Sequence, residues 1–427
     1  MKSRTALIDD AVLRAYVSAP HAPLSNRTLY KALEKDIPDP SVSFRPRARP
    51  HTSPSPINLA TRAIRWSQQS LKRAGILERL PGKRGLWTLS ERVKQELHQA
   101  RPTITLLAFS TDLGLAIWGS HHEVFSRLTL PITLCVTSPP YPLRRARAYG
   151  NPPVTDYVDF ICQALEPIIR QLVPGGSLCL NLGNDIFEAG SPARTLYRER
   201  TLIALCERYN LAPMDTLIWV NPTRPPCPVQ WASKNRIQLN ATWEAVLWLT
   251  NDPHRVHADN RRVLLPHTPR HHRLLAQGGE HRRTTYADGA HQLRPNSFAN
   301  PTAGRIPRNV LTIPHDCPET RAYRRHAAQL GMPAHGAIMP IALARFLIQY
   351  LSRPGDWIVD PFSGRATVGQ ACQELDRRFV CSEIIYEYLR VGAESFRNAP
   401  QFRLDPTFAS LTSSEPSQSA AANGDLP

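Results

Sequence analysis

The sequence has no apolar run long enough to cross a membrane as a helix, which takes about 20 residues. The longest candidate, residues 337–351, is interrupted by Arg345. A secretory signal is also missing, because Asp9 and Asp10 stand where its apolar core would lie. We therefore expect a soluble protein that stays in the cytoplasm and makes no contact with a membrane.

Cysteine is present but lacks the spacing of a structural framework. The chain has 427 residues and 8 cysteines, and no two cysteines form a Cys-x-x-Cys pair. This excludes a zinc ribbon and a disulfide scaffold, and it indicates reduced thiols that mostly fill the core. Hydrophobic residues make up 42% of the chain, which is enough for a sizeable core and excludes wholesale disorder.

Acidic residues are too few to balance the basic ones in two segments. Residues 1–100 contain 18 basic and 8 acidic residues, and residues 251–330 contain 13 and 6. The rest of the chain is neutral, with 21 of each. Two basic segments on a neutral body indicate two surfaces that bind a polyanion. The alternative, a merely well-solvated surface, would spread the charge more evenly.

The first basic segment has a pattern of helices followed by a hairpin. Helices are expected at residues 11–17, 27–34 and 57–74, with two short strands around a Gly-rich turn at 81–85. This order resembles a winged helix-turn-helix, whose third helix enters the major groove while the wing contacts phosphates. A helical cap or a dimerisation module remains the alternative. The resemblance implies that six residues contact DNA: Arg62, Arg65, Lys72, Arg73, Lys83 and Arg84.

Strands and helices alternate in two later parts of the chain. Residues 132–136 form a wholly apolar strand, as a parallel sheet buried on both faces requires, and alternation continues to residue 250. It resumes after residue 335 with helices at 341–351 and 367–374 and strands at 357–359 and 379–382. Residues 251–333 lack this periodicity and hold nine of the 15 histidines. The fold class is therefore α/β, with a doubly wound sheet, and the polar tail 404–427 is expected to be disordered.

A strand, a turn and a helix surround Asp360-Pro361-Phe362-Ser363-Gly364. The glycine lets the backbone approach a ligand, and Glu383, about twenty residues on, can accept hydrogen bonds from ribose hydroxyls. The segment resembles the D-P-F-x-G-x-G turn of DNA amino-methyltransferases, which bind S-adenosylmethionine there. Arg365 and Ala366 depart from it, since a small residue and a second glycine are usual. The resemblance implies a set of cofactor contacts: His335, Asp360, Pro361, Phe362, Gly364, Thr367 and Glu383.

The tetrapeptide Ser138-Pro139-Pro140-Tyr141 follows the apolar strand 132–136. It matches the S-P-P-Y active-site segment of the same enzymes. An exocyclic amine on a base is a poor nucleophile, so acceptors at Ser138 and Pro139 would steer its lone pair toward a methyl group. Tyr141 would stack an extruded base, because the target atom cannot be reached inside the duplex. The alternative is an ordinary Pro-Pro loop after a strand.

The order of the motifs carries further information. The tetrapeptide precedes the cofactor turn and the basic segment lies between them, an order that resembles the β class of DNA amino-methyltransferases. The resemblance implies a Rossmann-like core made of residues 101–250 and 334–403, with 251–333 as the target-recognition region. Four arginines there are candidates for DNA contacts: Arg261, Arg262, Arg282 and Arg283.

The resemblance implies methyl transfer from S-adenosylmethionine to duplex DNA in a bacterial or archaeal cell, often beside a restriction endonuclease for the same site. A first-position serine favours cytosine N4, with adenine N6 as the alternative. An inactive DNA-binding regulator and an RNA substrate also stay open. Cys227 is the nearest candidate for cytosine C5 chemistry, but direct transfer needs no such nucleophile. We expect no metal, although five histidines could form a cluster: His254, His257, His267, His271 and His272.

Overall fold

The computed structural model describes residues 8, 11–12, 15–16, 23–36, 58–73, 77–80, 85–89, 97–101, 103–143, 151–286 and 288–411. The chain forms two compact units, residues 1–96 and residues 97–427, and each is described by itself. No helix in these residues is long and apolar enough to cross a membrane.

The first unit packs helices against a small sheet. Residues 8, 11–12 and 15–16 are helical, and α2 (Asn26–Asp36) and α3 (Leu59–Arg73) follow. The strands β1 (Leu24–Ser25), β2 (Leu77–Arg79) and β3 (Leu86–Leu89) form an antiparallel sheet in the order β1-β3-β2. The Ser25 hydroxyl accepts a hydrogen bond from the Thr28 N–H and so caps α2. The apolar faces of these elements meet at Leu29, Ile64 and Trp87.

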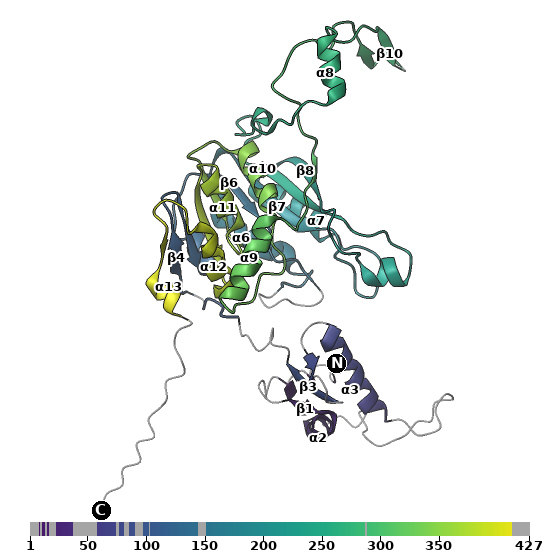
Figure 1. Ribbon diagram of the computed structural model, residues 1–427, viewed down its shortest axis with the longest axis vertical. Coiled ribbons are helices and arrows are strands. Elements are labelled where there is room, and N and C mark those ends of the chain that lie inside the picture. The colour runs from purple at the N-terminus through teal and green to yellow at the C-terminus, as the bar shows by residue number, and fades with distance from the viewer. Residues whose placement is uncertain are drawn as a thin grey trace, which may run out of the picture. The chain divides into compact units, whose positions relative to one another are not determined.

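The second unit is built on one ten-stranded sheet in the order β12-β8-β9-β7-β6-β13-β14-β5-β4-β15 (Figure 1). Five central strands, from β7 to β5, are parallel, while β9 runs antiparallel to both of its neighbours. The bounds are β4 (Leu106–Ser110), β5 (Gly114–Trp118), β6 (Ile132–Thr137), β7 (Leu172–Gly183), β8 (Ala212–Val220), β9 (Trp243–Thr250), β12 (Val310–Thr312), β13 (Trp357–Asp360), β14 (Arg378–Glu383) and β15 (Arg403–Leu404).

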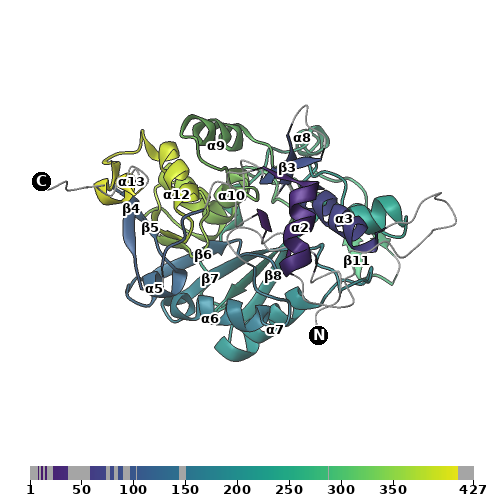
Figure 2. The same cartoon turned by 90° about the horizontal axis from the view of Figure 1, so that it is seen from below.

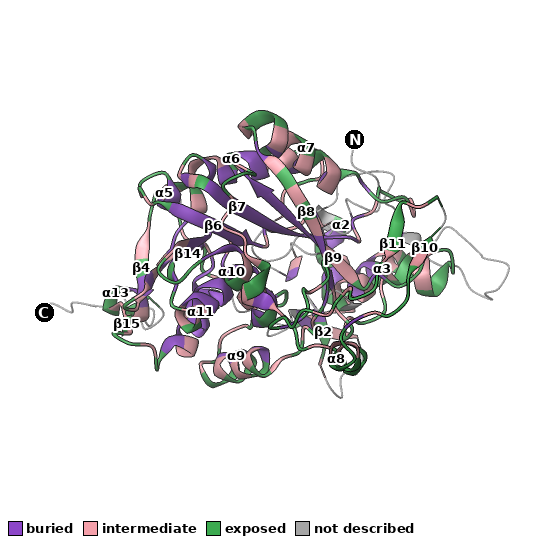
Figure 3. Cartoon of the chain, turned by 90° about the horizontal axis from the view of Figure 1, so that it is seen from above, coloured by how far each residue is buried: buried purple, intermediate pink, exposed green. Residues whose placement is uncertain are grey.

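Helices cover both faces of this sheet. Figure 2 shows α5 (His121–Phe125), α6 (Tyr157–Ile169) and α7 (Tyr197–Tyr209) along one face. On the other face lie α9 (Pro318–Gln329), α10 (Ile341–Leu351), α11 (Thr367–Glu374), α12 (Tyr386–Gly392) and the short η3 (Ala393–Phe396). Two apolar clusters result, one on each face, and every residue of β6 is buried (Figure 3). The expected doubly wound α/β sheet is confirmed.

Three parts of the fold differ from expectation. The antiparallel pair β4 and β5 extends the sheet within residues 101–131, which were expected to belong to the core but for which no individual strand was assigned. The core also resumes earlier than residue 334, because β12 pairs with β8 and α9 packs near α12. The tail expected to be disordered from residue 404 instead forms α13 (Pro406–Ser410) and buries Phe408 completely. The remaining tail, residues 412–427, lies outside the described residues.

Two excursions leave the sheet. Residues 260–306 form a lobe that projects beyond the sheet in Figure 1, with η2 (Asn260–Val263), α8 (Pro269–Ala276), β10 (Thr284–Tyr286) and β11 (His291–Leu293). β10 and β11 form a two-stranded hairpin, and a bridge between Leu265 and Arg305 closes the neck of the lobe. The second excursion joins β8 to β9 and contains the short π-helix η1 (Val229–Lys234).

Candidate active site

A cavity of about 880 Å³ opens beyond the carboxyl ends of the parallel strands β6, β13 and β14. Ligands in open α/β sheets bind at this edge, where neighbouring strands lead away in different directions. The cavity brings together two motifs that lie more than 200 residues apart in the chain. Its lining includes every catalytic and cofactor residue that the sequence predicted: Ser138, Pro139, Pro140, Tyr141, His335, Asp360, Pro361, Phe362, Gly364, Thr367 and Glu383.

The turn after β13 brings backbone to the cavity wall. Gly364 has a φ of +54°, which L side chains rarely adopt, and a Cβ added there would lie 3.6 Å from the His335 ring. The Gly364 N–H donates to Glu383 Oε2 at 2.7 Å, and the Ile385 N–H donates to Oε1 at 2.9 Å. Burial raises the pKa of the Glu383 carboxyl to about 7. Glu383, at the end of β14, therefore lies at the edge of the cavity and is hydrogen-bonded to the glycine turn.

Asp360 joins the two halves of the core. The Thr137 hydroxyl at the end of β6 donates to Asp360 Oδ1 at 2.7 Å, and the Phe362 N–H donates to the same oxygen at 3.1 Å. Burial raises the pKa of Asp360 to about 7. The carboxyl thus fixes the turn of the cofactor motif against the strand that carries the tetrapeptide.

An aromatic wall stands beside this turn. The Phe362 ring centre lies 4.8 Å from that of His121 and 5.8 Å from that of Phe160. Burial lowers the pKa of His121 to about 4, so its imidazole is neutral at pH 7. Sequence reasoning missed His121 and Phe160, although His121 follows the Gly119-Ser120 segment at the start of α5.

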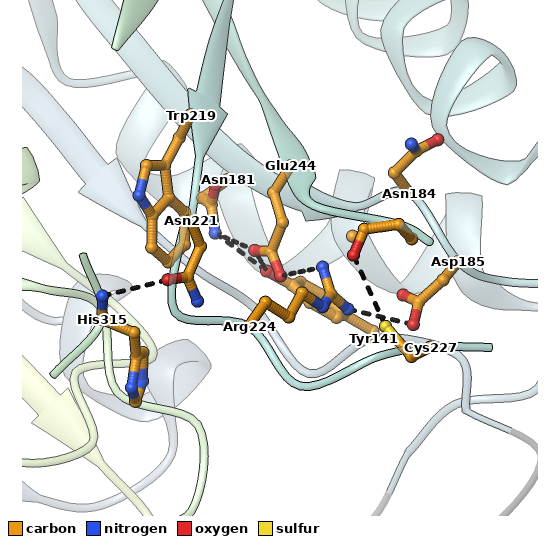
Figure 4. A network of polar contacts seen from close by, with 12 residues as sticks. Tyr141, Asn181, Asn184, Asp185, Trp219, Asn221, Arg224, Cys227, Glu244 and His315 are labelled. Atoms are coloured by element: carbon orange, nitrogen blue, oxygen red, sulfur yellow. Dashed lines mark hydrogen bonds and ion pairs between the residues drawn. The ribbon is translucent and has the colours of Figure 1, made fainter. Parts of the chain in front are cut away.

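On the other side of the cavity, the side chains of Ser138, Tyr141, Asn181 and Glu244 form one polar network, and Figure 4 labels the last three. The Tyr141 hydroxyl donates to Glu244 Oε2 at 2.8 Å and lies 3.1 Å from Ser138 Oγ. Asn181 Nδ2 donates to the Tyr141 hydroxyl and to Glu244 Oε2, at 2.9 and 2.8 Å. Asn181 Oδ1 is buried and has no hydrogen-bond partner among the described residues. Burial holds the pKa of Tyr141 well above its usual value, so this hydroxyl keeps its proton.

Arg224 closes the network from the segment after β8. Its guanidinium pairs with Asp185 Oδ2 at 3.0 Å and Glu244 Oε1 at 3.5 Å. A Cβ added to Gly183 would lie 2.9 Å from Tyr141 Cδ2, so only glycine leaves room for the ring. Sequence reasoning did not assign Asn181 or Arg224, which come from different strand ends and share no motif.

The family model for DNA methylases of the N6/N4 type matches residues 132–394, which span both halves of the core and the lobe between them. The chain belongs to this family. It is therefore a DNA methyltransferase, and S-adenosylmethionine is its cofactor.

Individual relatives of this methylase span most of the same region. Type II methyltransferase M.PvuII of Proteus hauseri is 29% identical over 291 residues, 68% of this chain and 85% of that protein. Type II methyltransferase M.SmaI of Serratia marcescens is 27% identical over 305 residues, 66% of this chain and 88% of that protein. The solved PvuII DNA methyltransferase (cytosine-N4-specific) superposes with a TM-score of 0.53 at 25% identity, covering 69% of this chain and 91% of that one.

The cavity of the methylase fits its cofactor. It offers a buried acid at Glu383, an aromatic wall at Phe362, and a glycine turn where the backbone can approach a ligand. Ser363 Oγ is buried at the same turn and lacks a hydrogen-bond partner in the part of the chain that the structure describes. A polar ligand in the cavity could supply the hydrogen bond that this hydroxyl lacks.

The structure accommodates both departures from the family's turn. The Arg365 side chain is 1% exposed, donates to Gln370 Oε1 at 2.8 Å, and lies 5.8 Å from the centre of the Tyr323 ring. Desolvation lowers the pKa of this guanidinium. Ala366 has φ 62° and ψ 42°, a left-handed conformation that explains why glycine is usual there.

The candidate DNA contacts of the methylase fall into three groups. Arg62, Arg65 and Lys72 are exposed on α3, where Arg65 also donates to the Tyr30 hydroxyl. Lys83, Arg84 and the Arg73 side chain lie outside the described residues. In the lobe, Arg283 is exposed, and the exposed Arg261 and Arg282 pair with Asp259 and Glu280, respectively.

Arg262 has a role other than the expected one. Its guanidinium donates to the carbonyl oxygens of Ser352, Tyr350 and His257. These carbonyls lie at the end of α10 and at the start of the lobe, where helix-end carbonyls have no partner within the helix. Arg262 therefore links the start of the lobe to α10. Its N–H groups donate to carbonyl oxygens of the protein.

Two sequence alternatives have no structural basis in the methylase. Among the described residues, no three His, Cys, Asp or Glu side chains gather where they could hold a metal ion. In the histidine-rich segment His267 and His271 lie close together, with ring centres 4.3 Å apart. The Cys227 thiol donates to the Ala241 carbonyl at 3.5 Å, and Cys227 is not among the residues that line the cavity.

Proposed function

We propose that the protein methylates the exocyclic N4 amine of cytosine in duplex DNA at a specific site. One observation carries this proposal: Ser138 to Tyr141 and Gly364 line the same cavity, so an amine and a methyl donor can meet there. A serine in the first position of the tetrapeptide favours cytosine N4 within the family. The relative with a solved structure at 25% identity is itself described as cytosine-N4-specific.

The hydrogen-bond network gives Ser138 the right polarity for this role. Tyr141 has one proton, and Glu244 accepts it at 2.8 Å. Ser138 Oγ, 3.1 Å away, therefore donates its own proton to the Tyr141 oxygen. Asn181 Nδ2 donates to Ser138 Oγ at 3.4 Å, which leaves one lone pair of this oxygen to accept a hydrogen bond from the base amine. The Pro139 carbonyl supplies a second acceptor, so the amine's lone pair can point across the cavity.

The ring of Tyr141 is held edge-on to Gly183 by this same network. A base turned out of the duplex can stack on an aromatic face that is fixed in this way. Preorganised acceptors cost no rearrangement when the amine becomes positively charged during transfer.

On the cofactor side, the chain's own groups hold the donor. Bound S-adenosylmethionine supplies a methyl group on a sulfonium, which a nitrogen can attack in line. Each oxygen of Glu383 accepts one backbone N–H and keeps a lone pair for a ribose hydroxyl. Phe362 and the neutral His121 offer flat faces for the adenine. No cysteine adduct is needed, since the amine itself is the nucleophile.

We further assign DNA binding to both basic parts of the chain. The first unit exposes Arg62 and Lys72 on α3, and its order of helices and strands supports a winged-helix arrangement. The lobe 260–306 would read the target sequence. Type II relatives support a partner restriction endonuclease for the same site, from which methylation would protect the host DNA in the cytoplasm.

Nucleoside mass spectrometry tests the proposed function. The protein is incubated with unmethylated genomic DNA and labelled S-adenosylmethionine, and the DNA is digested to nucleosides. We expect label in N4-methylcytosine. Label in N6-methyladenine would replace cytosine by adenine as the substrate. Saturable cofactor binding without any label in DNA would favour an inactive DNA-binding regulator instead.

A further inference from the structure

The excursion between β8 and β9, residues 222–241, begins at the cavity and then leaves the body of the unit. We call it the β8–β9 extension. Asn221, just before it, and Arg224 and Pro225, within it, line the cavity. Figure 1 shows the extension as a teal loop with the short η1 helix, projecting beside α7. Its base therefore belongs to the active site, whereas its far part does not.

Hydrogen bonds fix the extension to the body. The Ala241 N–H donates to the Cys227 carbonyl at 2.7 Å, which joins the outgoing and returning chains. Gln238 Nε2 donates to the Pro192 carbonyl at 3.2 Å, and Arg194 donates to Gln238 Oε1 at 3.3 Å. The extension thus has a defined position beside the cavity.

The surface of the extension is apolar and basic at once. Leu239 is 88% exposed, more than any other large hydrophobic residue of the described chain, and Ile237 and Val229 are 58% and 56% exposed. Its charged residues are Arg224, Lys234 and Arg236, and it contains no acidic residue. Three large apolar side chains so exposed on one short segment indicate a contact surface. The cations beside them specify a polyanion as the partner.

We infer that Leu239 enters the DNA base stack at the position from which the target base is extruded. Extruding a base costs a few kcal/mol of pairing and stacking, and an inserted apolar side chain restores contacts in the gap. Lys234 and Arg236 would hold the phosphates on either side of that gap. The inference rests on the proposed function, because it requires a base to leave the duplex and enter the cavity.

The experiment uses the full chain and a mapped target site. The site is located by sequencing DNA from cells that express the wild-type protein, and a synthetic duplex is made around it. A second duplex places the target base opposite a mismatch, so that it is already unpaired. Leu239→Ala and Leu239→Phe are compared with Ile203→Ala, a control on α7 at a residue that is 54% exposed.

We expect Leu239→Ala to transfer methyl at least about tenfold more slowly to the paired duplex, and within about twofold of wild type to the mismatched one. Leu239→Phe should stay near wild type, since it keeps an apolar side chain, and Ile203→Ala should not differ on either duplex. Cofactor affinity should be the same in all four proteins.

Several results would overturn the inference. One is wild-type transfer by Leu239→Ala on the paired duplex, and another is an equal loss on both duplexes. A third is a wild-type dimer in solution that Leu239→Ala converts to a monomer, because the surface would then bind a second copy. If the wild-type protein methylates no DNA at all, the proposed function is wrong. That result can be distinguished from a wrong role for Leu239, which requires an active wild-type protein.

Discussion

The hydroxyl of Ser138 is one oxygen in a chain of contacts that ends at an ion pair. Tyr141 and Asn181 fix its orientation, and Arg224 holds the Glu244 carboxylate on which both depend. An acceptor that is held in place stabilises developing positive charge without reorganisation. The roles assigned to these residues can be separated by single substitutions, because cofactor contacts lie on the opposite wall.

Ser138→Ala removes the acceptor and leaves the cofactor wall intact. We expect methyl transfer to fall by at least about a hundredfold, since one preorganised hydrogen bond contributes on this scale. Equilibrium dialysis with labelled S-adenosylmethionine should show an unchanged dissociation constant. Wild-type turnover in this variant would show that Ser138 does not orient the amine.

Glu383 makes cofactor affinity depend on pH. Burial raises its pKa to about 7, so the carboxylate that we propose as acceptor of the ribose hydroxyls is lost by protonation as the pH falls below 7. We expect S-adenosylmethionine to bind about tenfold more weakly at about pH 6 than at about pH 8, measured by calorimetry. Glu383→Gln does not titrate at this position, so it should bind more weakly and its affinity should change less with pH than that of the wild type; Asp360, whose pKa is also about 7, accounts for the change that remains. A wild-type affinity that does not change with pH, or a variant that changes as much as the wild type, would contradict the role of the Glu383 carboxylate.

The two short motifs could be recognised in the sequence because their residues are neighbours in the chain. All eleven catalytic and cofactor candidates line the cavity, including Ser138, Gly364 and Glu383. His121, Asn181 and Arg224 were not found, since each reaches the cavity from a separate strand end and has an ordinary local context. Arg262 was misjudged because charge alone does not tell a free guanidinium from one that caps a helix.

At the scale of elements, the start of α11 shows the cost of replacing a glycine. Ala366 precedes the helix in a left-handed conformation and is completely buried. Non-glycine residues are strained there by about 1–2 kcal/mol, while a buried methyl group contributes about 0.8 kcal/mol.

Ala366→Gly should therefore stabilise the fold slightly, by about 0.5 kcal/mol, because relief of strain exceeds the lost burial. Ala322→Gly in α9, a residue with right-handed helical neighbours, is the control and should destabilise by about 1 kcal/mol. Urea unfolding followed by circular dichroism gives both values. A loss of stability in Ala366→Gly would mean that packing, not backbone strain, dominates at this position.

Elements with strong periodicity were predicted closely, and short ones were not. The bounds expected for α10 and α11 agree with the structure residue for residue. In contrast, β12 has three residues, two of them exposed, and it joins the sheet only by pairing with β8. The helix α13 has five residues and is held by burial of Phe408. Tertiary contacts of this kind leave no periodic signal in a sequence.

At the scale of the whole molecule, the positive charge has a measurable consequence. If α3 contacts phosphates, each cation removed should lower the slope of log affinity against log salt by about 1. For Arg62→Ala/Lys72→Ala we expect a slope smaller by about 2 in a fluorescence anisotropy titration with duplex DNA. Methyl transfer per bound complex should not change, because these residues lie in the first unit.

The charge-matched control removes two exposed cations from the other unit. Arg170 follows α6 and Arg208 lies on α7, where each pairs with a carboxylate. Arg170→Ala/Arg208→Ala should leave the salt slope as in wild type. Equal slopes for both double variants and the wild-type protein would exclude α3 from the DNA surface.

The lobe is inserted between two segments of the chain that form one sheet, and this arrangement bears on how the DNA sequence specificity could change. The chain leaves the sheet after β9, builds the lobe, and re-enters at β12, while the tetrapeptide and the cofactor turn follow the neighbouring strands β6 and β13. The backbones of Leu265 and Arg305 pair with each other at the neck, so the two ends of the lobe lie side by side. If the lobe reads the target, descendants of this gene could exchange one lobe for another by recombination and acquire a new target sequence, with the reaction centre inherited unaltered.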